Sequence, residues 1–214
     1  MTPYQEIIKQ RKISRLCHFT KSSNLPFILG DGVFESNGIL STESVKKTKY
    51  LEILDTRRFD HKENYVCCSV QHINMAYFNR RKQKNSNDLF HEWAVLFIDP
   101  TIIDDTSLFS PVNAATGSGR YISDGPEAFN KIFEDELTWN SSAGKKHLVR
   151  PATKPANLPT NDQAEVLIKD KVPIEKIIGI GFFAPTYDVE VKRMSFWYPG
   201  KIKPCKLGDI PNGQ

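Results

Sequence analysis

The amino-acid sequence predicts a single α+β domain of 214 residues. Short apolar strands are interspersed with helices, without the regular strand–helix alternation of a doubly wound α/β fold. Two Gly-x-Gly turns, at Gly117 and Gly179, lack the third glycine of a dinucleotide-binding G-x-G-x-x-G turn. The chain is 39% hydrophobic and holds 13 Phe, enough for one sizeable core. Without repeats or a compositional boundary, we expect residues 1–214 to form one domain.

Capping residues and alternation define the first elements. A threonine, a proline and a glutamine at 2–5 have the pattern of a capping box with a first-turn proline, and they predict a helix over 3–11. Alternating apolar and polar residues predict a strand over 15–20. Two serines can cap a short helix over 25–29, which a following glycine should end.

The middle of the chain contains two apolar runs between polar segments. Residues 36–64 are polar and of mixed charge, and we expect a long loop or a mobile subdomain there. Buried strands are predicted over 65–70 and 93–98, with a short helix over 73–78 between them. An Asp-Gly-Pro-Glu sequence then marks a helix start that leads into 128–137.

The C-terminal part begins with a segment of little periodicity. Residues 139–162 contain three prolines and are expected to form a long loop. Apolar, β-branched runs predict strands over 164–168 and 177–183, separated by a charged turn. Thr186 is suited to cap a last helix, and the aromatic run 196–198 predicts a last strand.

Composition narrows the class of protein. A net charge of +4 and a pI near 8.8 are mildly basic and leave protein, nucleotide and nucleic-acid partners open. The four cysteines, at 17, 67, 68 and 205, form no C-x-x-C pair, so we expect neither a metal site nor a disulfide framework. The first residues do not resemble a secretory signal, and no apolar run reaches about 18 residues. We expect a soluble, cytoplasmic protein without a membrane partner.

A carboxylate and a carboxamide precede one predicted strand. If the strand already includes Gln163, then Gln163 and Glu165 share one face and Ala164 and Val166 face the core. Such a pair suits a reaction in which one group stabilises a developing cation and the other holds an acceptor. Cleavage of the nicotinamide–ribose bond of NAD is of this kind, because its transition state resembles an oxocarbenium ion. The alternative, more frequent for an isolated Q-x-E, is two exposed positions on a half-buried strand.

The first strand repeats this arrangement. His18 and Thr20 lie on the face opposite Cys17 and Phe19, and their imidazole and hydroxyl groups can bond a ribose hydroxyl or an amide such as nicotinamide. Asn24 can add a further amide contact. The alternative is that His18 is a structural residue whose hydrogen bonds are satisfied within the fold.

An arginine pair lies in the long polar segment. Arg57 and Arg58 can bind a pyrophosphate, because a guanidinium group matches the geometry of phosphate oxygens. The alternative is a solvated pair that Asp55 and Asp60 neutralise.

Two basic tracts contain no acidic residue. The first spans 64–87 and the second spans 137–161, directly before the Gln163–Glu165 pair. Acid-free basic tracts indicate an anionic partner, and neighbouring aromatic residues suit single-stranded nucleic acid, whose bases need not be flipped out of a duplex. The alternative is an ordinary solvated surface. The candidate substrate-binding residues are Arg80, Arg81, Lys145, Lys146, His147 and Arg150.

Taken in order, several of these motifs resemble the DarT family of DNA ADP-ribosyltransferase toxins. The motifs are His18-Phe19-Thr20, Asn24-Leu25-Pro26-Phe27-Ile28-Leu29, an arginine at 57 or 58, and Gln163-Ala164-Glu165-Val166-Leu167-Ile168. The resemblance implies an ADP-ribosyltransferase-like fold with a split central β-sheet and peripheral helices. It also implies an NAD-dependent mono-ADP-ribosyltransferase that attaches ADP-ribose to a base of single-stranded DNA and releases nicotinamide.

The resemblance further implies roles for individual residues. His18, Thr20 and Asn24 would contact NAD as co-substrate, one of Arg57 and Arg58 would serve NAD and catalysis, and Glu165 would be the catalytic carboxylate. Gln163 and the basic residues would bind the acceptor, and a macrodomain antitoxin would remove the ADP-ribose. RNA or a protein as acceptor, and a non-catalytic nucleic-acid-binding module, remain alternatives. No motif in the sequence identifies the acceptor base.

Overall fold

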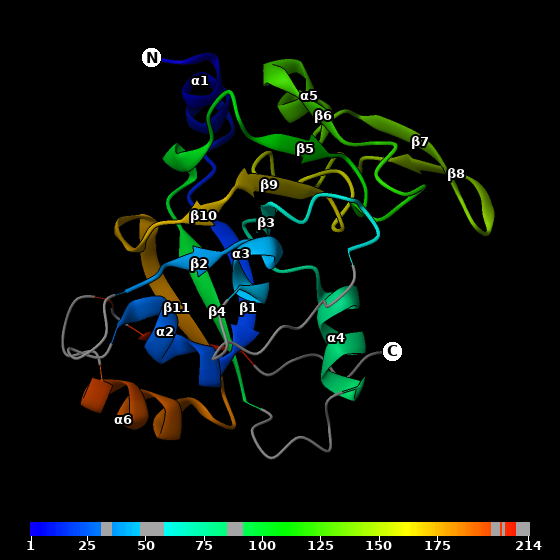
Figure 1. Ribbon diagram of the computed structural model, residues 1–214. Coiled ribbons are helices and arrows are strands. Elements are labelled where there is room, and N and C mark those ends of the chain that lie inside the picture. Colours follow the sequence, from blue (N-terminus) through cyan, green and yellow to red (C-terminus); the bar gives the residue numbers. More distant parts are fainter. Residues whose placement is uncertain (31–35, 48–57, 85–91, 198–201, 203, 209–214) are drawn as a thin grey trace.

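The computed structural model describes residues 1–30, 36–47, 58–84, 92–197, 202 and 204–208 (Figure 1). An eight-stranded sheet forms the centre of the molecule, and its neighbouring strands are antiparallel except for one parallel pair at the β12 edge. In order across the sheet, the strands are β12 (Pro204–Leu207), β11 (Ile177–Phe183), β4 (Trp93–Ile98), β1 (Leu16–Lys21), β3 (Tyr65–Val70), β9 (Glu165–Lys169), β5 (Leu108–Ser110) and β6 (Ser123–Asp124).

Helices cover both faces of this sheet, and two apolar clusters hold them there. Alternate side chains of β4 enter different clusters, Leu96 and Ile98 on one face and Val95 and Phe97 on the other. The larger cluster joins α1 (Pro3–Arg11), α2 (Leu25–Leu29), α5 (Gly125–Lys131) and α6 (Tyr187–Trp197). The smaller cluster surrounds Phe78 of α4 (Met75–Lys84), which lies on the opposite side from α2 and α6 (Figure 1).

The remaining short elements lie around the sheet. Single turns of 3₁₀ helix occupy 22–24, 100–102 and 174–176. The segment expected to be a long loop holds β2 (Ile39–Leu40) and α3 (Thr42–Lys46), and β2 pairs with β10 (Lys171–Val172). Residues 48–57 of this segment lie outside the described residues.

Local signals in the sequence explain the elements that were predicted. The capping box of α1 is present, with Thr2 Oγ1 accepting from the Gln5 amide at 3.3 Å and Gln5 Oε1 accepting from the Thr2 amide at 3.2 Å. The strand at 15–20 is confirmed as β1, shifted by one residue. The helix predicted at 73–78 begins two residues later and continues to Lys84.

The central sheet consists of two four-stranded halves that meet at a short seam. β1 pairs with β4 at six positions but with β3 at only two, Leu16 with Val70 and Cys17 with Ser69. Just beyond the last pair, the Cys67 carbonyl oxygen accepts a hydrogen bond from His18 Nδ1 at 2.9 Å. The split central sheet that the resemblance implied is therefore confirmed, with the split between β1 and β3.

The segment 139–162 is not one long loop, and that prediction was wrong. Its first part forms a hairpin of β7 (Glu136–Ser141) and β8 (Gly144–Val149). Leu137, which is buried, pairs across the hairpin with Leu148, so a few apolar positions suffice to fix the register. The helix predicted to start at the Asp-Gly-Pro-Glu sequence does begin there, at Gly125, but it ends at Lys131 and does not reach residue 137.

The C-terminal prediction also needs correction. The aromatic residues at 196 and 197 belong to the end of α6, not to a strand, and residue 198 lies outside the described residues. α6 begins directly after Thr186, as the capping residue indicated. The last described strand is β12, which lies parallel to β11.

Candidate active site

A cavity of about 390 Å³ lies at the seam between β1 and β3. Because the two strands separate there, the cavity is lined by residues of both sheet halves together with α4 and the segments before β3 and after β5. The sequence-predicted residues that line it are His18, Thr20, Asn24, Arg58, Arg80, Arg81 and Glu165.

Glu165 is the first residue of β9, and one of its oxygens is held by two donors. Asn113 Nδ2 donates to Glu165 Oε1 at 2.8 Å, and the Ala114 amide donates to the same oxygen at 3.3 Å. Asn113 is itself oriented, because its Oδ1 accepts from the Ala115 amide at 3.2 Å. The carboxylate therefore has a fixed orientation in the cavity.

Burial dominates the electrostatics of Glu165. Loss of solvent raises its pKa to about 7, although the Cys67 thiol, the Ala114 amide and the Arg58 charge each act to lower it. The Asp60 charge adds a smaller upward contribution. Glu165 can thus change its protonation state near neutral pH, which is characteristic of carboxylates at functional sites.

Arg58 lies beside Glu165 in a dense set of contacts. Its Nε donates to Asp60 Oδ1 at 2.9 Å, and its Nη2 forms an ion pair with the second oxygen of Asp60. Nη1 donates to the Tyr65 carbonyl at 3.2 Å, and Nη2 contacts Cys67 Sγ at 2.9 Å. Burial lowers the pKa of Arg58, but Cys67, Asp60 and Glu165 together raise it above its ordinary value. Arg57 lies outside the described residues.

His18, Thr20 and Asn24 form a polar edge of the cavity. Because a carbonyl oxygen can only accept, His18 Nδ1 carries the proton that it shares with the Cys67 carbonyl. Burial lowers the pKa of His18, so the imidazole is neutral and its Nε2 is a hydrogen-bond acceptor. Asn24 Nδ2 donates to Thr20 Oγ1 at 3.1 Å, which orients the buried hydroxyl.

Two arginines of α4 supply positive charge. Arg81 Nε donates to the Tyr77 hydroxyl at 2.8 Å, and the guanidinium carbons of Arg80 and Arg81 lie 5.8 Å and 5.2 Å from the centre of the Tyr77 ring. Together with Arg58, which forms an ion pair with Asp60, Arg80 and Arg81 are the arginines among the described cavity residues.

Gln163 does not line this cavity. The prediction that it shares a face with Glu165 required the strand to begin at Gln163, but β9 begins at Glu165. Gln163 lies in the preceding turn, where its amide donates to Asn161 Oδ1 at 2.9 Å. An asparagine side chain that bonds the backbone two residues later stabilises a turn instead of a strand.

The second basic tract also lies apart from the cavity. Arg150 donates to the Leu158 carbonyl at 2.9 Å, to Thr160 Oγ1 at 3.1 Å and to the Pro155 carbonyl at 2.7 Å, so its guanidinium holds the proline-containing loop together. Lys145, Lys146 and His147 are exposed on β8, within a hairpin that projects from the body of the molecule (Figure 1).

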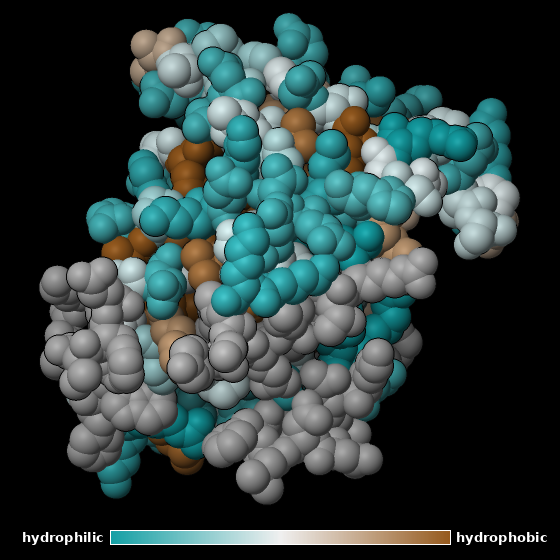
Figure 2. All heavy atoms as spheres, in the orientation of Figure 1, coloured by the Kyte–Doolittle hydropathy of each residue, from teal (hydrophilic) through white to brown (hydrophobic). Residues whose placement is uncertain are grey.

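One tyrosine connects this hairpin to the cavity. The Tyr121 hydroxyl accepts from the Asn140 amide at 2.7 Å and donates to the Asn140 carbonyl at 3.3 Å. Tyr121 follows the segment in which Asn113 holds Glu165. Hydrophilic side chains cover much of the visible surface of the hairpin (Figure 2).

Three residues near Glu165 were not expected from the sequence as site residues. Asp60 neutralises Arg58, Cys67 contacts both Arg58 and Glu165, and Asn113 orients Glu165. The segment 113–121 had no recognisable pattern. The only signal for Cys67 was its place on the less buried face of a strand within an acid-free tract.

The described part of the chain lacks a metal-ligand cluster, a disulfide and a helix able to cross a membrane. No group of three or more His, Cys, Asp or Glu residues is arranged there to hold a metal ion. The four cysteines are free thiols. None of the described helices has the length and apolar character needed to cross a membrane.

Comparison with solved structures shows the same fold at low sequence identity. DarT of Thermus sp. 2.9 in complex with ADP-ribosylated ssDNA matches with a TM-score of 0.57 and 12% identity, over 92% of this chain and 95% of that chain. The same protein in complex with NAD+ matches with a TM-score of 0.55 and 13% identity, over 92% and 96%. Thermosipho africanus DarTG in complex with ADP-ribose matches with a TM-score of 0.54 and 13% identity, and this chain spans 50% of its length.

Comparison with sequences is decisive for the family. No curated protein matches the chain. The family model described as "ssDNA thymidine ADP-ribosyltransferase, DarT" matches residues 17–195, a span that contains every described residue of the cavity. The chain therefore belongs to the DarT family of NAD-dependent ADP-ribosyltransferases that act on single-stranded DNA.

Proposed function

We propose that Glu165 is the catalytic carboxylate of this ADP-ribosyltransferase and that NAD binds in the cavity at the seam. The observation that carries the proposal is the fixed, buried carboxylate, which Asn113 and Ala114 hold by one oxygen beside the cation of Arg58. The other oxygen can bond a ribose hydroxyl. A preorganised negative charge at that place favours the positive charge that develops on the ribose.

The proposed chemistry exchanges one bond to the anomeric carbon for another. The nicotinamide leaves with the electron pair of its bond to the ribose, and a ring nitrogen of the acceptor base forms the new bond and loses its proton. Glu165 stabilises the oxocarbenium character between these two events. With a pKa of about 7, it can also accept the proton of the base.

We propose that the polar edge of the cavity holds the nicotinamide half of NAD. His18 offers a neutral Nε2 as acceptor, while the hydroxyl of Thr20 is oriented by Asn24. An acceptor and a hydroxyl together suit a carboxamide and a ribose hydroxyl. Because His18 is bonded to the Cys67 carbonyl, it also fixes the distance between the two halves of the sheet.

The charges in the cavity favour roles for its arginines that differ from those expected from the sequence. Arg58 is paired with Asp60, so its contribution to binding the NAD pyrophosphate is largely cancelled. We propose that Arg80 and Arg81 bind the pyrophosphate and that Arg58 orients Glu165. Both α4 arginines line the cavity and lie against the Tyr77 ring, which restricts their positions.

We propose that single-stranded DNA reaches Glu165 along the β7–β8 hairpin. Lys145 and Lys146 give the exposed strand β8 a positive charge, His147 lies beside them, and Trp139 pairs with Lys146 across the hairpin. Cations next to an aromatic ring suit the phosphates and bases of a single strand. The Tyr121 link places this surface beside the segment that holds Glu165.

We propose thymine as the acceptor base, in agreement with the description of the family model. We further propose that the enzyme acts as a toxin in the cytoplasm, where NAD and DNA are both available, with a macrodomain antitoxin as its antagonist. Co-expression of the chain with and without such a macrodomain, followed by quantification of ADP-ribosylated DNA, tests this partner. Equal levels of the adduct in both cultures would exclude it.

The experiment for the catalytic proposal compares Glu165→Gln with Glu127→Gln, an exposed glutamate on α5. Each variant is incubated with NAD and with single-stranded oligonucleotides of each base composition, and adducts and free nicotinamide are measured by mass spectrometry. We expect adducts on thymine only, and a loss of about 100- to 1,000-fold in Glu165→Gln alone. A folded Glu165→Gln variant with full activity would refute the proposal, and an RNA or protein adduct without a DNA adduct would refute the acceptor.

A further inference from the structure

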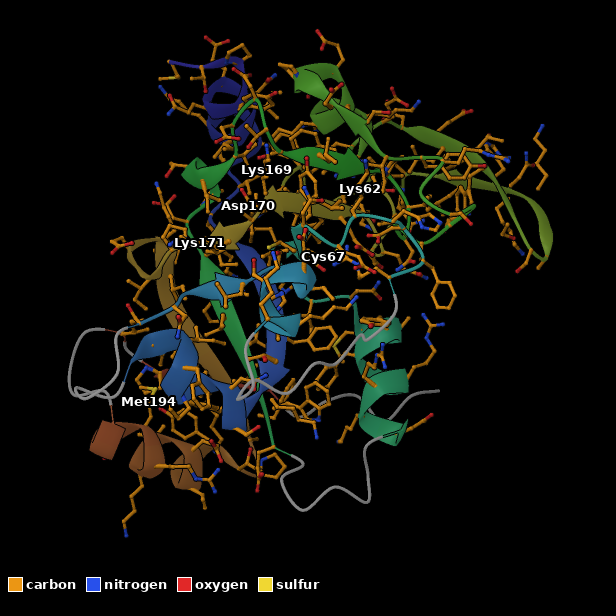
Figure 3. All side chains as sticks on the ribbon, in the orientation of Figure 1. Lys62, Cys67, Lys169, Asp170, Lys171 and Met194 are labelled. Carbon is orange, nitrogen blue, oxygen red and sulfur yellow. The ribbon has the colours of Figure 1, made fainter. Side chains whose placement is uncertain are left out.

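Cys67 lies between the two charged groups of the active site. It belongs to β3, near the centre of the molecule (Figure 3). Its Sγ is 2.9 Å from Arg58 Nη2, and its thiol lies close enough to the side chain of Glu165 to lower the pKa of that carboxyl group. The register of the sheet explains the second contact: Cys67 pairs with Leu167, so Glu165, two residues earlier on β9, is its diagonal neighbour on the same face.

The two contacts of the thiol have opposite directions. Arg58 has only N–H donors, so the sulfur accepts from it, and the neighbouring carboxylate of Glu165 is an acceptor available to the S–H proton. Burial and the neighbouring charge of Glu165 raise the pKa of Cys67 well above its usual value, so the thiol keeps its proton at neutral pH. Cys67 can therefore act as acceptor and donor at the same time.

The surrounding contacts leave the thiol as the direct connection between Arg58 and Glu165. Arg58 is fixed by Asp60 and by the Tyr65 carbonyl, and Glu165 Oε1 is fixed by Asn113 and Ala114. In the described residues, no hydrogen bond joins the guanidinium to the carboxylate; the guanidinium bonds the sulfur, and the thiol in turn acts on the carboxylate. The side chains therefore form a continuous row in which each contacts the next, in the order Asp60, Arg58, Cys67, Glu165 and Asn113.

We propose that Cys67 is a positioning residue for ADP-ribosyl transfer, whose thiol transmits the orientation and charge of Arg58 to Glu165 and favours the ionised carboxylate. The proposal rests on the catalytic role proposed for Glu165. Cys67 does not form a bond to NAD or to the base, and its contribution is a donated hydrogen bond. Because that bond is made to the ionised form of Glu165, its loss raises the pKa of the carboxylate.

Other groups also act on Glu165 and stay in place when Cys67 is replaced. Arg58 lowers the pKa of the carboxylate and Asp60 raises it, while the burial of Tyr77 on α4, of Cys68 on β3 and of Cys67 itself keeps these three groups neutral. The effect of a substitution at Cys67 should therefore be a displacement of the pH profile and not its disappearance.

The test measures kcat and the KM for NAD over about pH 5.5 to about pH 9, with a thymidine-containing single strand as acceptor. Cys67→Ala lacks a donor, Cys67→Ser restores one, and Cys205→Ser, which removes an exposed thiol, is the matched control. In Cys67→Ala we expect the acidic limb of kcat to move up by about one pH unit, with a roughly 5-fold lower kcat at pH 7 and a KM within about 3-fold of the original. Cys67→Ser should return the limb to its original position or below it.

Cys67→Val provides a second donor-free variant that fills the space of the thiol, in case Cys67→Ala melts below the assay temperature. An unchanged acidic limb in either donor-free variant would overturn the proposal. So would equal displacement by serine and alanine, because shape would then matter and not the donated proton. Glu165→Gln is measured in parallel: if it is inactive and Cys67→Ala behaves as the parent, only the role of Cys67 fails, whereas an active Glu165→Gln refutes both roles.

Discussion

Glu165, the proposed catalytic carboxylate, lies in an unfavourable environment for charge. Its burial raises the pKa to about 7, so the folded protein binds a proton that the unfolded chain releases at lower pH. The side chain of Asn113, the backbone amide of Ala114 and the thiol of Cys67 reduce the cost of burying the charge without removing it. The residue thus represents an exchange of stability for reactivity, which is common at catalytic positions.

The rate of transfer should rise with pH through the neutral range. In the proposed mechanism only ionised Glu165 stabilises the oxocarbenium character. A folded pKa of about 7 means that the ionised fraction grows roughly tenfold per pH unit below that value. Burial lowers the pKa of His18, so the imidazole should remain neutral over the same range. Initial rates of nicotinamide release at saturating DNA check this expectation, and a flat profile from about pH 5 to about pH 8 would contradict it.

Glu165→Gln should stabilise the protein at high pH. A carboxyl group whose folded pKa is raised contributes stability below its unfolded pKa, and this contribution is lost as pH rises toward about 7. The amide avoids the buried charge, so we expect a gain of about 2 kcal/mol, at most ~3 kcal/mol, in the free energy of unfolding at pH 8 and little change at pH 4.5. Urea denaturation at both pH values measures this. An equal gain in the exposed Glu127→Gln would show that burial is not the cause.

The sequence was sufficient for those site residues that lie on regular strands or follow them closely. The alternation of β1 indicated the polar edge at His18 and Thr20, and the resemblance indicated Glu165 and the arginine at 57 or 58. It was insufficient for Asn113, which reaches Glu165 from 52 residues away through a segment without periodicity. A contact of that kind depends on how β5 and β9 pair, and single-sequence patterns do not encode such pairing.

At the scale of elements, the β7–β8 hairpin differs from the rest of the structure. It pairs only with itself, and its β8 strand is exposed along nearly its whole length. A two-stranded hairpin is marginally stable alone. Its attachments are the buried Leu137 and the Tyr121 hydroxyl, which bonds both backbone groups of Asn140.

The hairpin lysines should contribute to DNA affinity and not to catalysis. We expect Lys145→Ala together with Lys146→Ala to weaken binding of single-stranded DNA, and to lower the slope of log K against log salt by about 1.4 for two lost phosphate contacts. Fluorescence anisotropy over a salt series measures both quantities. Lys9→Ala with Lys192→Ala, two exposed positions on α1 and α6, is the matched control. A similar loss in the control would indicate a general effect of net charge.

Element prediction failed where local patterns were short or ambiguous. The hairpin was mistaken for a loop because prolines follow it at 151–159 and because its apolar positions are few. The aromatic residues at the end of α6 suggested a strand, yet the helix continues through them to residue 197. Intrinsic preference for strand is weak, and tertiary contacts decide such cases.

At the scale of the whole molecule, the two sheet halves share few backbone bonds but one large cavity. Ligand that binds in the cavity contacts both halves, since His18 belongs to β1 while Cys67 and Glu165 belong to β3 and β9. A ligand that binds only the folded state must therefore stabilise the connection between the two sheet halves.

NAD should raise the melting temperature of the protein. At a free concentration of about 100 times its dissociation constant, a ligand that binds only the folded state adds about 2.7 kcal/mol. His18→Ala should lose most of this stabilisation, while Lys9→Ala should retain it, because Lys9 is exposed on α1. Differential scanning calorimetry with and without NAD checks the expectation. Equal shifts in both variants would place the NAD site elsewhere.

The seam between β1 and β3 also determines how the molecule should come apart. With backbone pairing at only two positions, it is the weakest connection between two long strands of the sheet, whereas the long strands within each half pair at four or more positions. Local opening free energies follow such differences in pairing and packing. Mild heating should therefore separate the halves in a partial unfolding event that abolishes activity while most secondary structure persists, and amide protons beside the seam should exchange with solvent before those in the centre of either half.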